Sequence, residues 1–148
     1  MKTRIALITA AVVALGTTAL APAAFAQDAA QDSQVSFQFE VGPNTGSVMV
    51  VLFSSKAGYD GNQPVAAMTV PASSSPVTVT FDGLAPGSYG MKSFHDVNGD
   101  GEMNTNPFGM PIEPYAFSNN ALGNMGPASW DSARFNVNGA VVQTITLR

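Results

Sequence analysis

Apolar and polar residues alternate in several short stretches of this chain. In residues 34–41, Val35, Phe37 and Phe39 fall on one side and Ser36 and Gln38 on the other. This period of two predicts a strand with one buried face. Residues 76–81, 88–95 and 131–137 alternate in the same way, whereas residues 47–53 are apolar at both parities. The latter pattern indicates a central strand that is covered on both faces.

Turn-forming residues separate the predicted strands. Residues 42–46 read Gly-Pro-Asn-Thr-Gly, and residues 54–63 form a polar stretch that predicts a loop. A weaker strand at residues 65–70 lies between two prolines, which favours the edge of a sheet. Asn138-Gly139 precedes the last predicted strand, at residues 141–148. The apolar register there favours a hairpin with a three-residue loop that pairs Val137 with Val141.

These patterns give seven short strands and no amphipathic helix. We therefore predict an all-β fold, a single seven-stranded antiparallel β-sandwich over residues 34–148 with Greek-key connections. A long loop follows the fifth strand and continues to about residue 128. It is rich in Asn, Gly, Pro, Met and aromatic residues and poor in the charged residues of disordered linkers. We expect it to be ordered and functional, because long loops in compact domains usually are.

The N-terminal residues predict export. Lys2 and Arg4 precede an apolar run at residues 5–20, and Ala24-Phe25-Ala26 fits a signal-peptidase site. The alternative, a membrane anchor, needs about 20 apolar residues, and this run is shorter. The predicted parts are a cleaved signal peptide (residues 1–26), a flexible leader (27–33) and the β-sandwich domain (34–148). The mature protein is expected in the periplasm or outside the cell, with no transmembrane segment.

Charge and cysteine content narrow the function further. After cleavage, four basic residues stand against ten acidic ones, which gives a net charge of −6. So acidic a chain lacks the clustered Lys and Arg residues that bind nucleic acid or anionic lipid. There is no cysteine, so stability must come from the core, with help from a bound cation.

The long loop opens with a cation-binding pattern. Asp96, Asn98 and Asp100 alternate, and Gly101 permits the sharp turn that follows. The pattern matches the first nine positions of an EF-hand calcium loop, in which a carbonyl oxygen supplies the seventh position. The predicted Ca²⁺ ligands are therefore Asp96, Asn98, Asp100, Glu102 through its carbonyl, and Asn104.

The match to an EF-hand is incomplete. Pro107 stands where a bidentate Glu closes the shell, and no helices flank the loop. Glu113 or another loop would have to supply the remaining oxygens. The alternative is an Asn/Asp/Gly turn that binds no metal.

His95, the single histidine of the chain, lies beside the predicted cation site. It is either a general base for a metal-assisted hydrolase or a residue that orders the loop through hydrogen bonds. A further alternative is a copper site that combines His95 with thioether ligands. The methionines of the mature chain are not clustered in sequence: Met49, Met68, Met91, Met103, Met110 and Met125.

Four aromatic residues in or after the loop are candidates for holding it against the sandwich. They are Phe108, Tyr115, Phe117 and Trp130. Each aromatic side chain can bury about 150–250 Å². The alternative is a stacking surface for a sugar or a peptide.

Several segments resemble a family of small exported bacterial proteins known as domain of unknown function 2141. The resemblance rests on residues 81–89, 94–101, 108–120 and 133–135, including the His-Asp-x-Asn-Gly-x-Gly and Gly-x-Pro-x-Glu motifs. The family usually has an acidic residue where this chain has Asn104, which implies weaker cation binding here. The Leu-x-Pro-Gly-x-Tyr segment is also similar to transthyretin-like and carboxypeptidase-regulatory β-sandwiches. This similarity agrees with the predicted immunoglobulin-like or transthyretin-like sandwich and implies no function.

The sequence thus predicts an exported, non-enzymatic β-sandwich module that Ca²⁺ stabilises. Its role is binding or structural in the cell envelope, with an envelope protein or a glycan as partner. The alternatives are a hydrolase that uses His95 and a periplasmic copper-binding protein.

Overall fold

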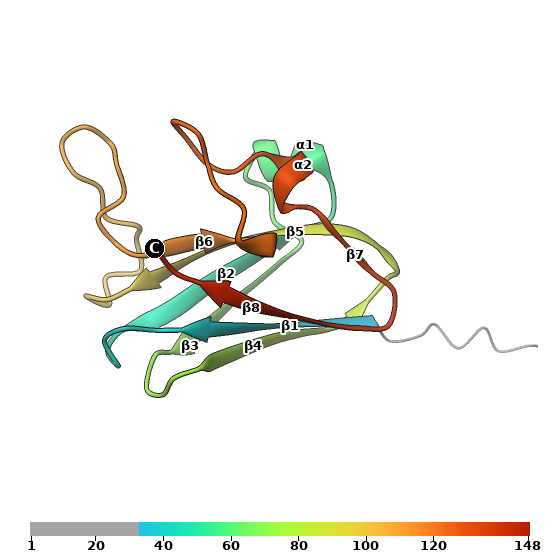
Figure 1. Cartoon of the computed structure of the whole chain (residues 1–148), viewed down its shortest axis with the longest axis horizontal. Coiled ribbons are helices and arrows are strands. Elements are labelled where there is room, and N and C mark those ends of the chain that lie inside the picture. Colours follow the sequence, from blue (N-terminus) through green and yellow to red (C-terminus); the bar gives the residue numbers. More distant parts are fainter. Residues whose placement is uncertain (1–32) are drawn as a thin grey trace, which may run out of the picture.

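A computed structural model describes residues 33–148, which form two β-sheets that pack face to face (Figure 1). The three-stranded sheet has the order β4-β1-β8. Its strands are β4 (Val77–Leu84), β1 (Ser33–Glu40) and β8 (Ala140–Thr146). The five-stranded sheet has the order β3-β2-β5-β6, with β7 paired to the start of β5. Its strands are β3 (Ala66–Pro71), β2 (Ser47–Phe53), β5 (Gly87–Asp96), β6 (Tyr115–Phe117) and β7 (Phe135–Val137).

The all-β prediction is confirmed. The predicted signal peptide and residues 27–32 of the leader lie outside the described residues. Within residues 33–148, no helix has the length and apolar character needed to cross a membrane.

The alternating residues fill the space between the sheets. Val35, Phe37 and Phe39 of β1 are fully buried and face Val48 and Leu52 of β2, which are buried too. The Phe37 ring makes edge contacts with other rings at centroid distances of 5.8–6.4 Å. Such contacts add stability beyond the area that they bury.

The C-terminal strands pair differently from the prediction. β8 runs parallel to β1, with Val141 opposite Val35 and Ile145 opposite Phe39. β7 is antiparallel to β5 in the other sheet. Asn138-Gly139 therefore carries the chain from one sheet to the other, and the predicted hairpin and purely antiparallel sandwich are wrong. Alternation identifies the buried face of a strand but not its neighbour, and Val137 and Ile145 are buried in either arrangement.

Three one-turn helices replace predicted loop or strand. They are α1 (Lys56–Asp60), η1 (Ser118–Asn120) and α2 (Trp130–Ala133). Ser55 caps α1 by accepting a hydrogen bond from the amide of Gly58 at 3.1 Å, and Ser129 caps α2 in the same way. The absence of helix was thus predicted wrongly at residues 56–60 and 130–133. The serines at positions 55 and 129 were the sequence signal for these helix starts.

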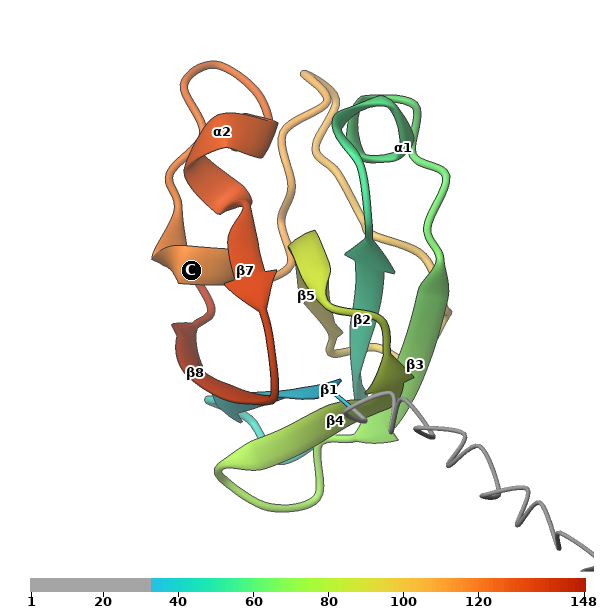
Figure 2. The same ribbon diagram turned by 90° about the vertical axis from the view of Figure 1, so that its right-hand side faces the viewer.

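α1 and α2 lie against the outer face of the five-stranded sheet (Figure 2). Together with neighbouring residues they build a second apolar cluster there, which we call the outer cluster: Phe53, Tyr59, Phe117, Ala128, Trp130 and Ala133. The Trp130 ring lies so close to β5 that a Cβ on Gly90 would stand 2.8 Å from its Cζ3 atom. Glycine at position 90 is therefore required for this packing.

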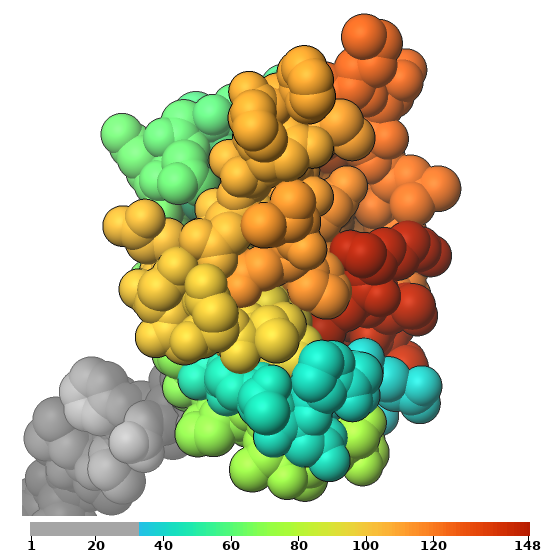
Figure 3. All heavy atoms as spheres, turned by 90° about the vertical axis from the view of Figure 1, so that its left-hand side faces the viewer, coloured from blue at the N-terminus to red at the C-terminus, as the bar shows by residue number. Residues whose placement is uncertain are grey.

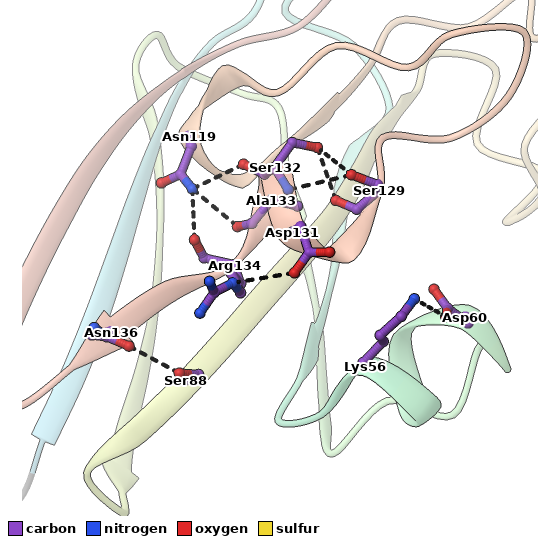
Figure 4. Close-up of polar contacts among 10 residues, drawn as sticks. All are labelled: Lys56, Asp60, Ser88, Asn119, Ser129, Asp131, Ser132, Ala133, Arg134 and Asn136. Atoms are coloured by element: carbon purple, nitrogen blue, oxygen red, sulfur yellow. Dashed lines mark hydrogen bonds and ion pairs between the residues drawn. The ribbon is translucent and has the colours of Figure 1, made fainter.

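Two asparagines connect η1 to the elements beside it. The Asn119 Nδ2 atom donates to the carbonyls of Ser132, Ala133 and Arg134 at 2.9–3.2 Å, which satisfies the end of α2 (Figure 4). The Asn120 side chain accepts from the amide of Thr146 and donates to the carbonyl of Thr144. The outer edge of β8 is therefore covered by a side chain.

Candidate functional site

The loop that carries the predicted site begins at the end of β5, where His95 and Asp96 leave the sheet. His95 is fully buried between the sheets. Its Nε2 atom lies 2.7 Å from the carbonyl oxygen of Thr45. Because a carbonyl only accepts, Nε2 donates, and Nδ1 is left buried without a hydrogen-bond partner among the described residues. The imidazole therefore anchors the turn between β1 and β2.

The same turn touches the loop through its backbone. Gly46 has φ +70°, and a Cβ there would stand 1.8 Å from the carbonyl oxygen of Asp96. Only glycine permits this approach. The turn and the start of the loop are thus fixed to each other.

Asp96 organises the first half of the loop. Its carboxylate is 3% exposed and accepts three backbone hydrogen bonds. Oδ1 accepts from the amides of Gly99 (2.7 Å) and Asp100 (3.2 Å), and Oδ2 accepts from Gly101 (2.8 Å). Hydrogen bonds to a charged acceptor are stronger than neutral ones. They fold residues 96–101 into a compact turn around one buried carboxylate.

Glu113 closes the loop from its far end. Its Oε1 atom accepts from the amide of Val97 at 2.9 Å, and Oε2 accepts from the amide of Asn104 at 3.1 Å. The side chain is buried, and the next residue, Pro114, accepts from the amide of His95. One carboxylate thus bridges two points of the loop that are seven residues apart.

An exposed polar cluster lies outside this scaffold and contains Asn98, Asp100 and Asn104. The Asn98 Nδ2 atom donates to Asp100 Oδ2 at 3.0 Å and to Asn104 Oδ1 at 2.7 Å. The Asn104 Nδ2 atom donates to the same Asp100 oxygen at 2.9 Å. The hydrogen bond from Asn104 is the largest of the causes that lower the pKa of Asp100, followed by those from the Glu102 amide and from Asn98.

The five predicted calcium ligands therefore fall into two groups. Asn98, Asp100 and Asn104 come together, and two of their oxygens point at one amide group. The carboxylate oxygens of Asp96 are turned to backbone amides. Glu102, predicted to bind through its carbonyl, is an exposed residue whose amide donates to Asp100. Within residues 33–148 there is no group of three or more His, Cys, Asp or Glu side chains that could hold a metal ion.

The four predicted loop anchors also divide. Phe117 and Trp130 are buried in the outer cluster, and Tyr115 is half-buried with its ring 5.9 Å from that of Phe117. Phe108 is 90% exposed, so its prediction as an anchor is wrong. The loop is already held by Asp96 and Glu113, so its tip needs no buried ring.

The tip instead presents apolar side chains to solvent. The exposed large apolar residues of this loop and the next are Met103, Phe108, Met110, Ile112, Leu122 and Met125. Both loops project to the same side of the molecule as α1 and α2 (Figures 1 and 2), and the first covers much of one face in Figure 3. A backbone bridge between Thr105 and Pro111 closes the tip of the first loop.

The sequence did not point to Tyr59 of the outer cluster or to Lys92, which lies beside it. The Lys92 ammonium lies 4.3 Å from the Tyr59 ring centre and 4.9 Å from that of Phe53, and it donates to the Tyr59 carbonyl at 2.7 Å. Burial lowers the pKa of Lys92. The Tyr59 hydroxyl donates to the carbonyl of Ala128 at 3.0 Å. Tyr59 lies in a segment predicted as a loop, and Lys92 lies at a polar position of the alternating residues 88–95, so the pattern did not predict their contact.

Two hollows mark the surface, and neither includes His95 or the polar cluster. One of about 80 Å³ lies beside β6 and is lined in part by Tyr115, Leu122 and Arg148. A wide, open one lies at the opposite end, between residues 86–88 and 136–138. No convergent set of catalytic groups lines either hollow.

A family described as "Uncharacterized protein conserved in bacteria (DUF2141)" matches residues 39–145. This match includes the five-stranded sheet, the whole loop and the outer cluster, but only the last two residues of β1 in the three-stranded sheet. Neither a curated protein nor a solved structure matches the chain.

Proposed function

The chain belongs to the DUF2141 family of bacterial proteins, and we propose that it is an exported, non-enzymatic module that binds a partner in the cell envelope through its 97–114 loop. The observation that carries this proposal is the contrast within the loop. Its base is fixed by two buried carboxylates, while its tip exposes Phe108, Met110 and Ile112. An ordered loop that exposes apolar side chains is typical of an interaction site.

The chemistry of the tip suits an adaptable contact. Methionine side chains are flexible and polarisable, and they recur at surfaces that accept varied partners. Phe108 adds a rigid ring that can enter an apolar pocket of a protein or stack on a sugar. A base that is already ordered lowers the entropy cost of binding.

The position of His95 supports a binding role over hydrolysis. A general base must reach the proton that it abstracts. The His95 ring is fully buried and committed to the Thr45 carbonyl. For the copper alternative, the same burial separates His95 from the exposed Met103, Met110 and Met125.

Site-specific photo-cross-linking in intact cells tests the proposal. A photoreactive residue at position 108 should give a defined adduct with an envelope protein or glycan. The matched control is position 142 on β8, where Val142 is also an exposed apolar residue, 63% accessible. Equal labelling at both positions, or none at 108, would mean that the loop tip is not the binding element.

Weak calcium binding is a second candidate function, and a specific observation favours it. Asp100 Oδ2 and Asn104 Oδ1 both point at the Asn98 amide group. A cation at that point would take the place of the amide protons, once the Asn98 side chain rotates to offer its oxygen. Of these three residues only Asp100 is charged. The calcium affinity should therefore be as weak as that of calcium-binding extracellular modules, with Kd about 10⁻⁴–10⁻³ M.

Thermal unfolding in millimolar calcium and in chelator tests the second candidate. Asp100→Asn should abolish the calcium-dependent rise in Tm, because it removes charge and keeps the acceptor oxygen. Glu102→Gln is the matched control, since that neighbouring carboxylate is exposed and has the same charge. Asp96→Ala is unsuitable, because it also removes three backbone hydrogen bonds. If the wild type melts alike in calcium and chelator, the loop binds no calcium.

A further inference from the structure

The edge strands of the two sheets are not equally protected against pairing with a strand of another molecule. The edge of β8 is capped by Asn120, and β6 is bonded by the backbone of Arg148 through Tyr115. β4 carries a charge at Asp82, and its register with β1 shifts near Ser33. Proteins usually blunt an edge with charge, proline, bulges or cover. β3 carries no charge, and its prolines and the irregular bond from the Val65 amide to the Leu52 carbonyl lie at its ends, so the middle of the strand is open.

The β3 edge is uncharged and accessible. Residues 65–71 read Val-Ala-Ala-Met-Thr-Val-Pro. Val65 is 57% exposed and Met68 42%, and Ala67 and Thr69 are exposed as well. The chain as a whole carries a net charge of −4, so charged surfaces of two copies repel. Residues 65–71 add no charged side chain of their own to that repulsion.

The hydrogen bonds between β3 and β2 show which backbone amides and carbonyls of β3 point away from the sheet. Ala72 donates to the carbonyl of Gly46 at 3.0 Å, in line with the antiparallel register of β3 and β2. Residues that bond to the neighbouring strand alternate along an antiparallel pair. Val70, Met68 and Ala66 therefore bond to β2. The amides and carbonyls of Ala67 and Thr69 point away from it.

We propose that β3 pairs antiparallel with β3 of a second copy, about a two-fold axis at Met68. In this register, Ala67 of each copy stands opposite Thr69 of the other. Each such pair exchanges two N–H···O bonds, and the symmetry makes the two pairs identical. The outward groups of β3 are thus complementary to themselves.

Two prolines limit the extent of this pairing. Pro71 has no amide to donate, and Pro64 precedes the strand at its other end. The ladder is therefore confined to the few residues around Met68. A ladder this short, with an interface completed by Met68 and Val65, predicts a reversible dimer and not a filament.

Sedimentation equilibrium of the purified protein over concentrations up to about 1 mM, the weak end of measurable affinities, tests the dimer. The wild type should show a monomer–dimer equilibrium. Thr69→Pro removes one outward amide from each copy, and so two hydrogen bonds from the dimer, and leaves the bonds to β2. It should raise the dimer Kd at least about tenfold, the factor for even one ordinary hydrogen bond. Thr69→Ala keeps the amide and should still dimerise.

A second pair of variants tests the register even if Thr69→Pro does not fold. Ala67→Lys with Thr69→Lys places like charges opposite each other across the two-fold axis and should dissociate the dimer. Ala67→Lys with Thr69→Glu places opposite charges there and should preserve it. A monomeric wild type at every concentration overturns the proposal. Equal behaviour of the two double variants, or growth into larger assemblies, overturns the two-fold register.

Discussion

Two consecutive segments without regular strands, residues 97–114 and 118–134, are held to the sandwich by opposite means. The first is fixed by side-chain carboxylates that accept backbone amides, and its large apolar residues face solvent. The second is fixed chiefly by burial of Trp130, Ala133 and Ala128 in the outer cluster, with hydrogen bonds from Asn119 and Asn120 in support. Both segments expose apolar side chains, including Leu122 and Met125 in the second, but only the second also buries a large ring, that of Trp130, to hold its fold.

The two mechanisms should also differ in cooperativity. The outer cluster packs on Phe53 of β2 and against Gly90 of β5, so it is continuous with the five-stranded sheet. The 97–114 loop is joined to the sandwich mainly at its base, through Asp96, Glu113 and His95. We therefore expect changes in the cluster to weaken the whole fold, and changes at the loop base to act first on local order.

The largest effect is expected from Trp130→Ala. The indole is 7% exposed, packs edge-on to Tyr59 at 5.6 Å and lies against Gly90. Loss of so large a buried ring should lower the free energy of unfolding by about 3–5 kcal/mol, which chemical denaturation measures. The matched control is Phe108→Ala, which should change it by less than about 0.5 kcal/mol. Similar losses in both variants would contradict the contrast between the segments.

A smaller and more local effect is expected from Asp96→Asn. The amide side chain keeps the shape of the carboxylate but replaces one acceptor oxygen with a donor that faces the Gly101 amide or its neighbours. We expect a loss of about 2–3 kcal/mol, the range for hydrogen bonds to charged groups. Hydrogen exchange should accelerate at Gly99, Asp100 and Gly101.

The control for this local effect is Asp100→Asn, whose carboxylate is exposed. It should leave the exchange of the Gly101 amide unchanged, because Asp96 holds that amide. Protection at Gly101 that survives in Asp96→Asn would show that something other than this carboxylate orders the turn.

The strands that alternate cleanly were predicted well, because burial on one face imposes a period of two. Strands were predicted at residues 34–41, 76–81 and 88–95, and β1, β4 and β5 lie there. Residues 131–137 also alternate, yet α2 occupies the first part. Ala133 and Val137 are buried in the structure and would also be buried in a strand. The Ser129 cap and the packing of Trp130 against β5 favour the helical turn.

The site was predicted less fully than the strands. Asp96, Asn98, Asp100 and Asn104 were identified from spacing, and the structure brings the last three together. Spacing could not tell that Asp96 serves the backbone, since a ligand and an amide acceptor have the same sequence pattern. Tyr59 and Lys92 were missed because their contacts join β5 to a helix 33 residues away, and such long-range pairs leave no local period.

The smallest effect, and the one most specific to the outer cluster, is expected from Tyr59→Phe. The hydroxyl donates to the buried Ala128 carbonyl, so its removal should cost about 1 kcal/mol at neutral pH. Burial, with a lesser contribution from Asp60, raises the pKa of Tyr59 from 10.0 to about 12. Because the folded pKa exceeds the unfolded one, the stability from the neutral phenol is complete below pH 10 and is lost as pH rises towards 12.

An alkaline titration followed by tyrosinate absorbance and by denaturation measures this linkage. One of the three tyrosines should ionise late in the wild type, together with loss of stability, and Tyr59→Phe should remove both the late step and its share of the pH dependence. The 97–114 loop contains no tyrosine, so an alkaline loss of stability that persists unchanged in Tyr59→Phe would place its origin outside the outer cluster. Because the loop is held by Asp96 and Glu113 and not by Tyr59, hydrogen exchange at Gly101 should remain as slow relative to the intrinsic rate as at neutral pH until the protein unfolds.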